Sequence, residues 1–160
     1  MSRSRPANAA RSRASPPNFS DTGSRATICG MDTPDSLVRS FISALSNRDI
    51  DTAATMVSEG FEYDNVPIGK AHGAEGLRST LKGFFGMLED IDWEIMRQTS
   101  SGDLDRGTVL NERDDRVKIA GEWRTLPVCG VFEIENGKIV LWRDYFDRAT
   151  LMTVMGTGGQ

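Results

Sequence analysis

Residues 136–147, NGKIVLWRDYFD, contain a turn signal followed by a stretch with the alternation of a β-strand. Asn136-Gly137 strongly favours the two-residue turn that joins antiparallel strands. The residues on either side then predict a hairpin of two strands, over roughly 124–135 and 138–147. This hairpin fixes the end of the fold, and the earlier segments can be placed relative to it.

The second strand of the hairpin carries a carboxylate on an apolar face. Because side chains alternate along a strand, one face is expected to hold Val140, Trp142, Asp144 and Phe146. Three of these four side chains are large and apolar. A carboxylate left unpaired among them would cost several kcal/mol or would change its pKa. Asp144 therefore needs a partner from another part of the chain.

A second polar cluster, in a strand expected over 106–113 and on towards 120, supplies that partner. The same alternation puts Asn111, Arg113 and Asp115 on one face of it. Two ionised aspartates and one arginine carry a net charge of −1, and one retained proton would neutralise the cluster. Arginine stays charged, so the proton belongs to an aspartate.

Holding a proton on an aspartate at pH 7 requires its pKa to rise by about 3 units, or ~4 kcal/mol. Burial beside another carboxylate can supply this much. Two carboxylates whose pKa values are pushed apart can act as an acid and a base. A buried Asp–Arg–Asp network can also serve only to fix strand register, and this structural alternative stays open.

An earlier strand, expected over 61–66, adds two further polar groups. Phe61, Tyr63 and Asn65 share one face, so an inward Phe61 brings the other two inward. The candidate site then combines residues of three strands, Tyr63, Asn65, Arg113, Asp115 and Asp144. Addition of water to an epoxide suits this set, because the departing oxygen needs a proton while the weak nucleophile needs a base.

The helices precede most of the strands. Thr33-Pro34 is a helix-start signal, and the apolar spacing that follows predicts a first helix, then a short one after Asp51 and a third over 73–88. From 91 the period changes to two, and a final amphipathic turn is expected at 151–155. We therefore expect an α+β fold in which three to four helices cover a curved mixed or antiparallel sheet and leave a conical pocket.

Composition limits the classes of protein. The 160 residues, 38% hydrophobic and 26% charged, fit one globular domain, and no apolar run is long enough to span a membrane. Cys129 lies in an apolar run and is expected to be a reduced core residue. With a single histidine, His72, and no paired Cys/His spacing, we expect neither a metal nor another cofactor.

Residues 1–30 differ from the rest of the chain. They contain five arginines and one acid, about +4, which leaves about −8 for residues 31–160 from the total of −4. An acidic domain without a basic face argues against nucleic acid as a partner. We expect a disordered basic tail over 1–30, a catalytic domain over 31–156 and a flexible end over 157–160. A transit-like segment, an upstream extension before Met31 and an inert tail all remain open, and we expect the protein to be cytoplasmic.

Four blocks of the chain resemble the limonene-1,2-epoxide hydrolase family, over about residues 33–150. They are Tyr63-Asp64-Asn65-Val66-Pro67, Glu112-Arg113-Asp114-Asp115, Gly130-Val131-Phe132 and the segment from Gly137 to Asp147. Their order and spacing match the family, which has a cone-shaped cystatin/NTF2-like fold. The resemblance implies one-step hydrolysis of an epoxide to a vicinal diol, without metal or covalent ester, by proteins that are usually homodimers.

The resemblance also implies a role for each residue. Asp144 is similar to the base that deprotonates water, Asp115 to the acid, and Arg113 to the bridge between them. Tyr63 and Asn65 match the pair that holds the water. A hydrophobic substrate pocket would be lined by Phe84, Leu88, Leu126, Val128, Trp142 and Phe146. The loop Ile68-Gly69-Lys70 and the residue Asp114 depart from the family pattern, which leaves the epoxide itself open.

Two other readings of the cone fold remain. A ketosteroid-isomerase-like or polyketide-cyclase-like enzyme needs one acid–base carboxylate and an oxyanion donor, and would not use the second aspartate and its arginine. A non-catalytic member would bind a hydrophobic ligand unchanged and keep the polar network as structure.

Overall fold

The structure is a computed structural model that describes residues 31–156. In chain order the elements are α1 (Pro34–Ser46), α2 (Ile50–Thr55), β1 (Val57–Asn65), β2 (Gly69–His72), α3 (Gly73–Phe85), β3 (Asp90–Gly102), β4 (Arg106–Ile119), β5 (Glu122–Glu135), β6 (Lys138–Tyr145) and α4 (Arg148–Val154). The segments 1–30 and 157–160, expected to be a basic tail and a flexible end, lie outside the described residues.

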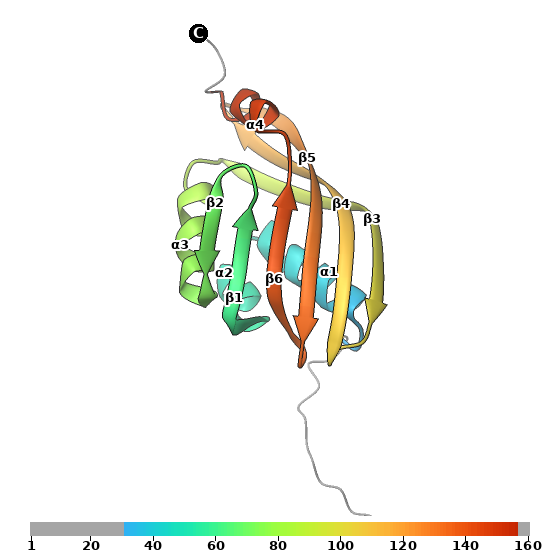
Figure 1. The fold of residues 1–160 in the computed structure, drawn as a ribbon. Helices are drawn as coiled ribbons and strands as arrows, with labels where there is room; N and C mark the ends of the chain where they lie inside the picture. Colours follow the sequence, from blue (N-terminus) through green and yellow to red (C-terminus); the bar gives the residue numbers. More distant parts are fainter. Residues whose placement is uncertain (1–30, 157–160) are drawn as a thin grey trace, which may run out of the picture.

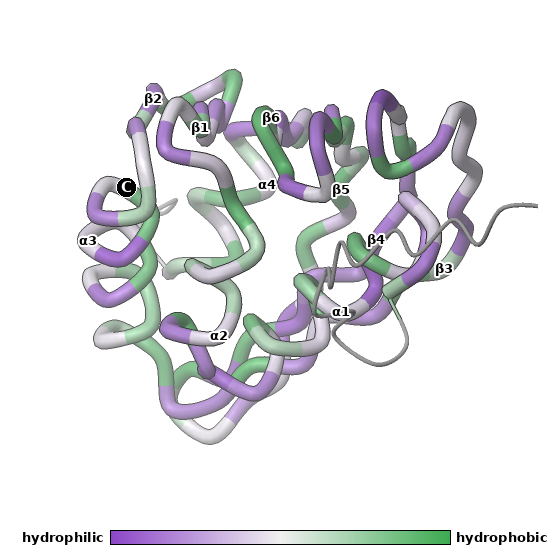
Figure 2. Tube along the Cα trace, turned by 90° about the horizontal axis from the view of Figure 1, so that it is seen from below, coloured by the Kyte–Doolittle hydropathy of each residue, from purple (hydrophilic) through white to green (hydrophobic). Residues whose placement is uncertain are grey.

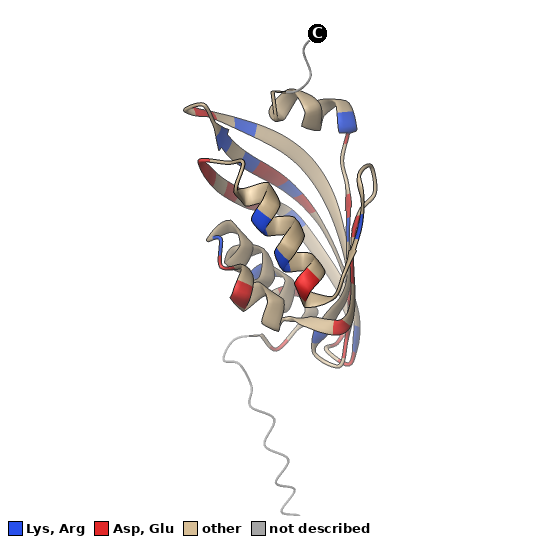
Figure 3. Ribbon diagram, turned by 90° about the vertical axis from the view of Figure 1, so that its left-hand side faces the viewer, with Lys and Arg blue, Asp and Glu red and all other residues tan. Residues whose placement is uncertain are grey.

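One sheet of six strands, in the order β2-β1-β6-β5-β4-β3, forms the body of the fold (Figure 1). Neighbouring strands are antiparallel except β1 and β6, which run parallel. The expected antiparallel meander therefore describes β3 to β6, and β1 makes the sheet mixed. The sheet curves around α1, α2 and α3, while α4 lies across one end (Figure 3). The predicted α+β class is confirmed.

Helix α1 begins where the sequence signal lies. The Thr33 hydroxyl accepts a hydrogen bond from the Ser36 amide, and the Ser36 hydroxyl accepts one from the Thr33 amide, both at 3.1 Å. This reciprocal cap satisfies two amides that have no partner inside the helix. Pro34 stands at the first helical position, where its missing N–H is not needed.

Some element bounds differ from the sequence prediction. Helix α3 ends at Phe85, three residues earlier than expected, and Leu88 follows it in a tight turn. Strand β1 starts at Val57, four residues earlier than expected. The start was missed because a register shift between Val57 and Glu62 interrupts the alternation by which strands are recognised. Strand β2 was not predicted; it pairs with β1 through only four residues, too few to show a pattern.

A second register shift changes one face of the final strand. Ile134 pairs with Ile139 and Glu133 pairs with Leu141, so Val140 is an extra residue in β6. Ile139 is consequently fully buried and Val140 only half-buried. The expectation that Val140 shares the inner face with Trp142 and Asp144 is wrong. Strict alternation resumes after the bulge, so Asp144 keeps the inward direction predicted for it.

Three aromatic rings stand in a row across the sheet beneath the helices. Tyr63, Trp142 and Phe132 occupy paired positions on β1, β6 and β5. Tyr63 stacks on Trp142 with ring centroids 4.1 Å apart, and Phe132 stacks on its other face at 5.9 Å. The edge of Phe41 in α1 closes the cluster at 5.2 Å. Trp142 is therefore fully buried and held in one orientation.

The outer face of the sheet is exposed. Cys129 lies on it, opposite Glu112 and Tyr145, and is an exposed free thiol. The prediction of a core cysteine is therefore wrong, because in a half-buried strand the residues between the core positions point to solvent. Helix α3 has the same division between an apolar inner side and a polar outer side: Figure 2 shows its hydrophobic residues on the side that faces the interior. No helix within residues 31–156 is long and apolar enough to cross a membrane.

Candidate active site

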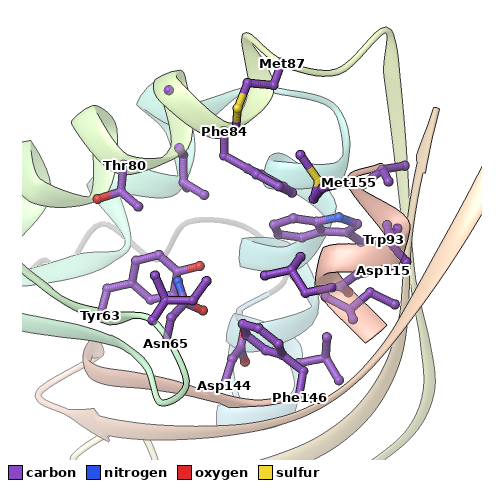
Figure 4. Close-up of a pocket in the computed structure, with 18 residues that line it drawn as sticks. Tyr63, Asn65, Thr80, Phe84, Met87, Trp93, Asp115, Asp144, Phe146 and Met155 are labelled. Atoms are coloured by element: carbon purple, nitrogen blue, oxygen red, sulfur yellow. The ribbon is translucent and has the colours of Figure 1, made fainter. Parts of the chain in front are cut away.

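A cavity of about 330 Å³ opens between the sheet, α3 and α4. Its wall is mainly apolar, with four residues of the predicted constellation among the lining side chains (Figure 4). These are Tyr63, Asn65, Asp115 and Asp144. The fifth, Arg113, is fully buried behind them and does not line the cavity. The fold thus brings all five residues together, although they come from three strands.

Arg113 bridges the two aspartates. Its Nε and Nη2 atoms donate to the two oxygens of Asp115 at 3.0 and 3.2 Å, and Nη2 also donates to Asp144 Oδ2 at 2.8 Å. The guanidinium lies against the rings of both Trp93 and Trp142, about 6 Å from each centroid, and these two rings contact each other edge to face. Aromatic faces and two carboxylates together hold the positive charge away from water.

The partners of Asp144 differ from those of Asp115. Asp144 receives one donor on each oxygen, because Trp142 Nε1 donates to Oδ1 at 2.7 Å while Arg113 occupies Oδ2. Trp142 is held by the aromatic stack described above, so its N–H is aimed before any ligand arrives. Asp115 has hydrogen bonds only from Arg113 among the described residues.

Burial dominates the electrostatics of this cluster. It raises the pKa of Asp144 to about 6, against the lowering effect of Arg113 and with a further rise from the charge of Asp115. Burial also raises the pKa of Asp115, again opposed by Arg113. For Arg113 burial alone would lower the pKa, but the two aspartates outweigh it and the pKa is raised. One carboxylate that keeps a proton beside one that has lost it is the arrangement this environment favours.

Tyr63 and Asn65 lie beside Asp144. Asn65 pairs with Asp144 across the parallel β1–β6 ladder, and Tyr63 pairs with Trp142. Burial raises the pKa of Tyr63, so its phenol stays protonated and can donate. The Asn65 carbonyl accepts from Ile68 N in the turn that follows, while its side chain faces the cavity. Figure 4 shows Tyr63, Asn65 and Asp144 near one another in the cavity wall.

Four of the six expected pocket residues line the cavity, Phe84, Leu126, Val128 and Phe146. Leu88 does not, because α3 ends before it and its side chain packs in the core. Trp142 does not either, since Tyr63 and Phe132 cover its two faces. It contacts Asp144 instead.

Several lining residues were missed from the sequence. Trp93 lies between the cavity and Arg113, and its place in an alternating strand was the one available signal. Leu151 and Val154 reach the cavity from α4, and Met155 reaches it from the residue that follows the helix. A short terminal helix gives no sign of where it packs. Asn111 lies on the predicted face and accepts a hydrogen bond from Arg113, but it does not line the cavity.

Within the described chain, no three His, Cys, Asp or Glu side chains come together as a group that could hold a metal ion.

The comparisons with known proteins agree with this geometry. Residues 33–156 match the family model of the limonene-1,2-epoxide hydrolase catalytic domain. This chain belongs to the limonene-1,2-epoxide hydrolase family. It is 34% identical to epoxide hydrolase EphG of Mycobacterium tuberculosis over 110 residues, which cover 69% of this chain and 70% of that protein.

The solved structures show how widely the fold is shared. A limonene-epoxide-hydrolase-like epoxide hydrolase of M. tuberculosis matches with a TM-score of 0.63 and 31% identity, over 76% of this chain and 88% of the other. A hypothetical protein of Catenulispora acidiphila with a ketosteroid-isomerase-like fold has a TM-score of 0.64 but 18% identity, over 78% of this chain and 94% of the other. A putative polyketide cyclase of Xanthomonas campestris has a TM-score of 0.60 and 14% identity, over 76% of this chain and 95% of the other. The last two share the NTF2-like fold alone.

Proposed function

We propose that this protein hydrolyses an apolar epoxide to a vicinal diol in one acid–base step, without a covalent intermediate. The observation that carries the proposal is the pair of buried aspartates bridged by Arg113 at the base of an apolar cavity. Membership of the limonene-1,2-epoxide hydrolase family supports the same activity.

The surroundings of the aspartates divide their roles. Asp144 stands beside Tyr63 and Asn65, which offer hydrogen bonds to a water molecule, so it is the base. Asp115 lies on β4 beside Trp93, across the network from Tyr63 and Asn65, and the family resemblance makes it the acid. Burial raises the pKa of both carboxyls, so the pair can hold the one proton that this role needs. Water attacks an epoxide carbon and gives its proton to Asp144 as the C–O bond breaks. The epoxide oxygen takes the proton of Asp115.

This step leaves the proton on Asp144 and the charge on Asp115. Arg113 contacts both carboxylates through the same Nη2 atom, so the positive charge stays adjacent to whichever aspartate is ionised. Return of one proton from Asp144 to Asp115, through solvent after the diol leaves, restores the starting state. The cluster keeps a net charge of zero throughout, which suits its burial.

The cavity indicates an uncharged substrate of small or medium size. Its volume is about 330 Å³, and the two aspartates are the only ionisable acids or bases of the described chain in its lining apart from the Tyr63 phenol. An anionic substituent inside the cavity would find no cation in the lining and would be costly to desolvate, and the carboxylate that could meet a cationic one is already paired with Arg113.

The other cone-fold activities fit less well. An isomerase or cyclase of the kind considered above leaves the second aspartate and its arginine without a task. A binding protein would leave the aimed Trp142 N–H and the raised pKa of Asp144 without a consequence.

The test is diol formation from limonene, cyclohexene and styrene oxides in buffer with EDTA and H₂¹⁸O. In a single turnover with enzyme in excess, direct attack by water puts ¹⁸O in the diol. A covalent ester would instead deliver unlabelled carboxylate oxygen to the first diol. Unlabelled diol would refute the one-step mechanism, and no diol from any epoxide would refute the proposed activity.

The family resemblance supports a homodimer, and the exposed outer face of the sheet offers apolar residues such as Leu110 and Tyr145 for it. Sedimentation velocity would show a single species of about twice 17.6 kDa. We also keep the cytoplasm as the expected compartment, on the composition of the sequence alone.

A further inference from the structure

Arg113 has a contact that the proposed reaction does not use. Its Nη1 atom donates to Asn111 Oδ1 at 3.0 Å, on the side of the guanidinium away from the two aspartates. Asn111 is 3% exposed and sits two residues before Arg113 on the same face of β4. It does not line the cavity, so it can affect the reaction only through Arg113.

Asn111 is in turn fixed by hydrogen bonds that lead through Gln98 to Asp35. Its Nδ2 donates to Gln98 Oε1 at 3.2 Å, and Gln98 Nε2 donates to the carboxylate and the backbone carbonyl of Asp35 at 2.8 and 3.1 Å. The chain of bonds thus runs from the buried arginine through two amides to the first turn of α1. Arg39 donates to the other oxygen of Asp35 at 2.9 Å.

The direction of every bond in this chain is fixed. Arginine can only donate, so Asn111 must present its oxygen to Arg113 and its NH₂ to Gln98. Gln98 must then accept from Asn111 and donate to Asp35, whose pKa is lowered chiefly by that bond. Neither amide can rotate by half a turn without opposing two acceptors or two donors. The chain therefore holds a single orientation from end to end.

Gly130 has no side chain, and this leaves room on β5 for the side chains of Arg113 and Asn111. It pairs with Asn111 on one side and with Asp144 on the other, so Arg113 crosses β5 above it to reach Asp144. A Cβ at this position would lie 2.7 Å from Asn111 Oδ1 and closer still to Arg113 Nη1. Any side chain here would push Arg113 and Asn111 apart.

We propose that Asn111, held by Gln98 and Asp35, is a positioning residue that fixes the Arg113 guanidinium between the two aspartates, in the space that Gly130 leaves open. This inference rests on the proposed function but concerns a part of the network that the chemistry does not touch. Without Asn111, the guanidinium keeps its hydrogen bonds to Asp115 and Asp144 but loses the one that holds Nη1. It can then rotate within its own plane, which lengthens its bond to Asp144.

The experiment compares Asn111→Leu and Gln98→Met with the natural protein. Leucine and methionine have about the volume of the amides they replace but neither donate nor accept. Thr99→Val is the matched control, because Thr99 is the neighbour of Gln98 on the exposed face of β3. With an epoxide that the protein turns over, we expect kcat of Asn111→Leu to fall by 10- to 100-fold with KM within about threefold. Gln98→Met should show a smaller fall and Thr99→Val none.

A second readout does not depend on turnover. Trp142 donates its indole N–H to Asp144, so the ¹H–¹⁵N signal of this indole reports ionisation of that carboxyl. The charged or titratable groups facing Asp144 are Arg113 and Asp115 from β4 and Tyr63 from β1. The signal, assigned by its loss of titration in Asp144→Asn, should titrate near pH 6 in the natural protein. In Asn111→Leu the midpoint should move to higher pH, because a loosened Arg113 stabilises the carboxylate less.

Each outcome decides the matter. A lower kcat with a raised midpoint supports the positioning role. A lowered unfolding temperature with kcat and midpoint unchanged would overturn it and make the chain purely structural. If the natural protein forms no diol, the proposed function fails, but the indole titration still tests whether Asn111 positions Arg113.

Discussion

Two neighbouring residues of β6, Arg143 and Asp144, each form an ion pair of 2.8 Å, but on opposite faces of the sheet. Arg143 points outward and binds Asp64 of β1, and Asp144 points inward and binds Arg113 of β4. The outward pair lowers the pKa of its acid. Burial works to raise the pKa of Asp64, but hydrogen bonds from Arg143 and Lys70 outweigh it. The inward pair leaves its acid with a pKa raised to about 6.

The contrast shows that distance does not decide what an ion pair does. Asp64 is as little exposed as Asp115, but it has two cations, Lys70 and Arg143, whose side chains are themselves partly in water. Asp144 and Asp115 share a single cation, Arg113, which is fully buried, so the effect of burial on their pKa outweighs its attraction. The same two residue types form an ordinary ion pair on one face and, on the other, the pair to which we assign acid–base chemistry.

The largest expected effect is on activity, which should depend on Asp144 and not on Asp64. Asp144→Asn should lower kcat by about 10³-fold or more, since loss of a general base typically costs 10²- to 10⁴-fold. Asp64→Asn should change kcat by less than about twofold, because its side chain lies on the outer face. Steady-state kinetics on the same epoxide, with circular dichroism as the check on folding, measures both. Substantial turnover by a folded Asp144→Asn protein would place the base elsewhere.

Replacement of Arg113 should lower the stability of the protein far more than replacement of Arg143. Arg113→Met leaves two buried carboxyls without a cation, and we expect the free energy of unfolding to fall by about 3–5 kcal/mol at pH 7. Arg143→Met should lower it by less than about 1 kcal/mol, because the pair is partly solvated. Urea unfolding followed by tryptophan fluorescence measures both values. Equal losses would mean that the two faces do not differ as described.

The sign of the pH dependence should also differ. For Asp144 the folded pKa of about 6 exceeds the unfolded value of 3.8, so its favourable contribution is present at low pH and lost as pH rises through 6. Replacement by Asn should therefore raise stability relative to the natural protein between pH 4 and pH 7, by about 3 kcal/mol at most. For Asp64 the folded pKa is lowered, so its contribution is present above 3.8 and lost as pH falls.

Unfolding curves of Asp144→Asn and Asp64→Asn at several pH values test these signs. Relative to the natural protein, the stability of the first variant should rise with pH and that of the second should fall. Shifts of the same sign in both variants would contradict the comparison.

Much of the site could be predicted from the sequence because alternation along a strand is a local property. Asp144 was placed on an inner face by its apolar neighbours, Arg113 by the partner that a buried Asp144 requires, and Tyr63 and Asn65 by Phe61. Asn136-Gly137 predicted the hairpin, and both residues have the positive φ angles, 50° and 74°, that such a turn requires. Local steric preferences decide these features, so a short window of sequence is enough.

Features that depend on neighbouring strands were missed. The extra residue at Val140 and the parallel pairing of β1 with β6 exist only in relation to a partner strand. The sheltered position of Trp142, the approach of α4 to the cavity and the chain from Asn111 to Asp35 have the same origin. Gly130 appeared in a family block, but its role depends on an arginine that crosses above it from the next strand.

The sequence by itself determined the class of the fold, the direction in which each polar side chain points and the residue types that meet in the site. Only the tertiary structure decided which aspartate receives the Trp142 N–H, how Arg113 divides its donors and which walls close the cavity. The reason is physical: side-chain direction follows from backbone geometry within a few residues. Hydrogen-bond partners and desolvation instead depend on atoms that the chain brings together from far apart.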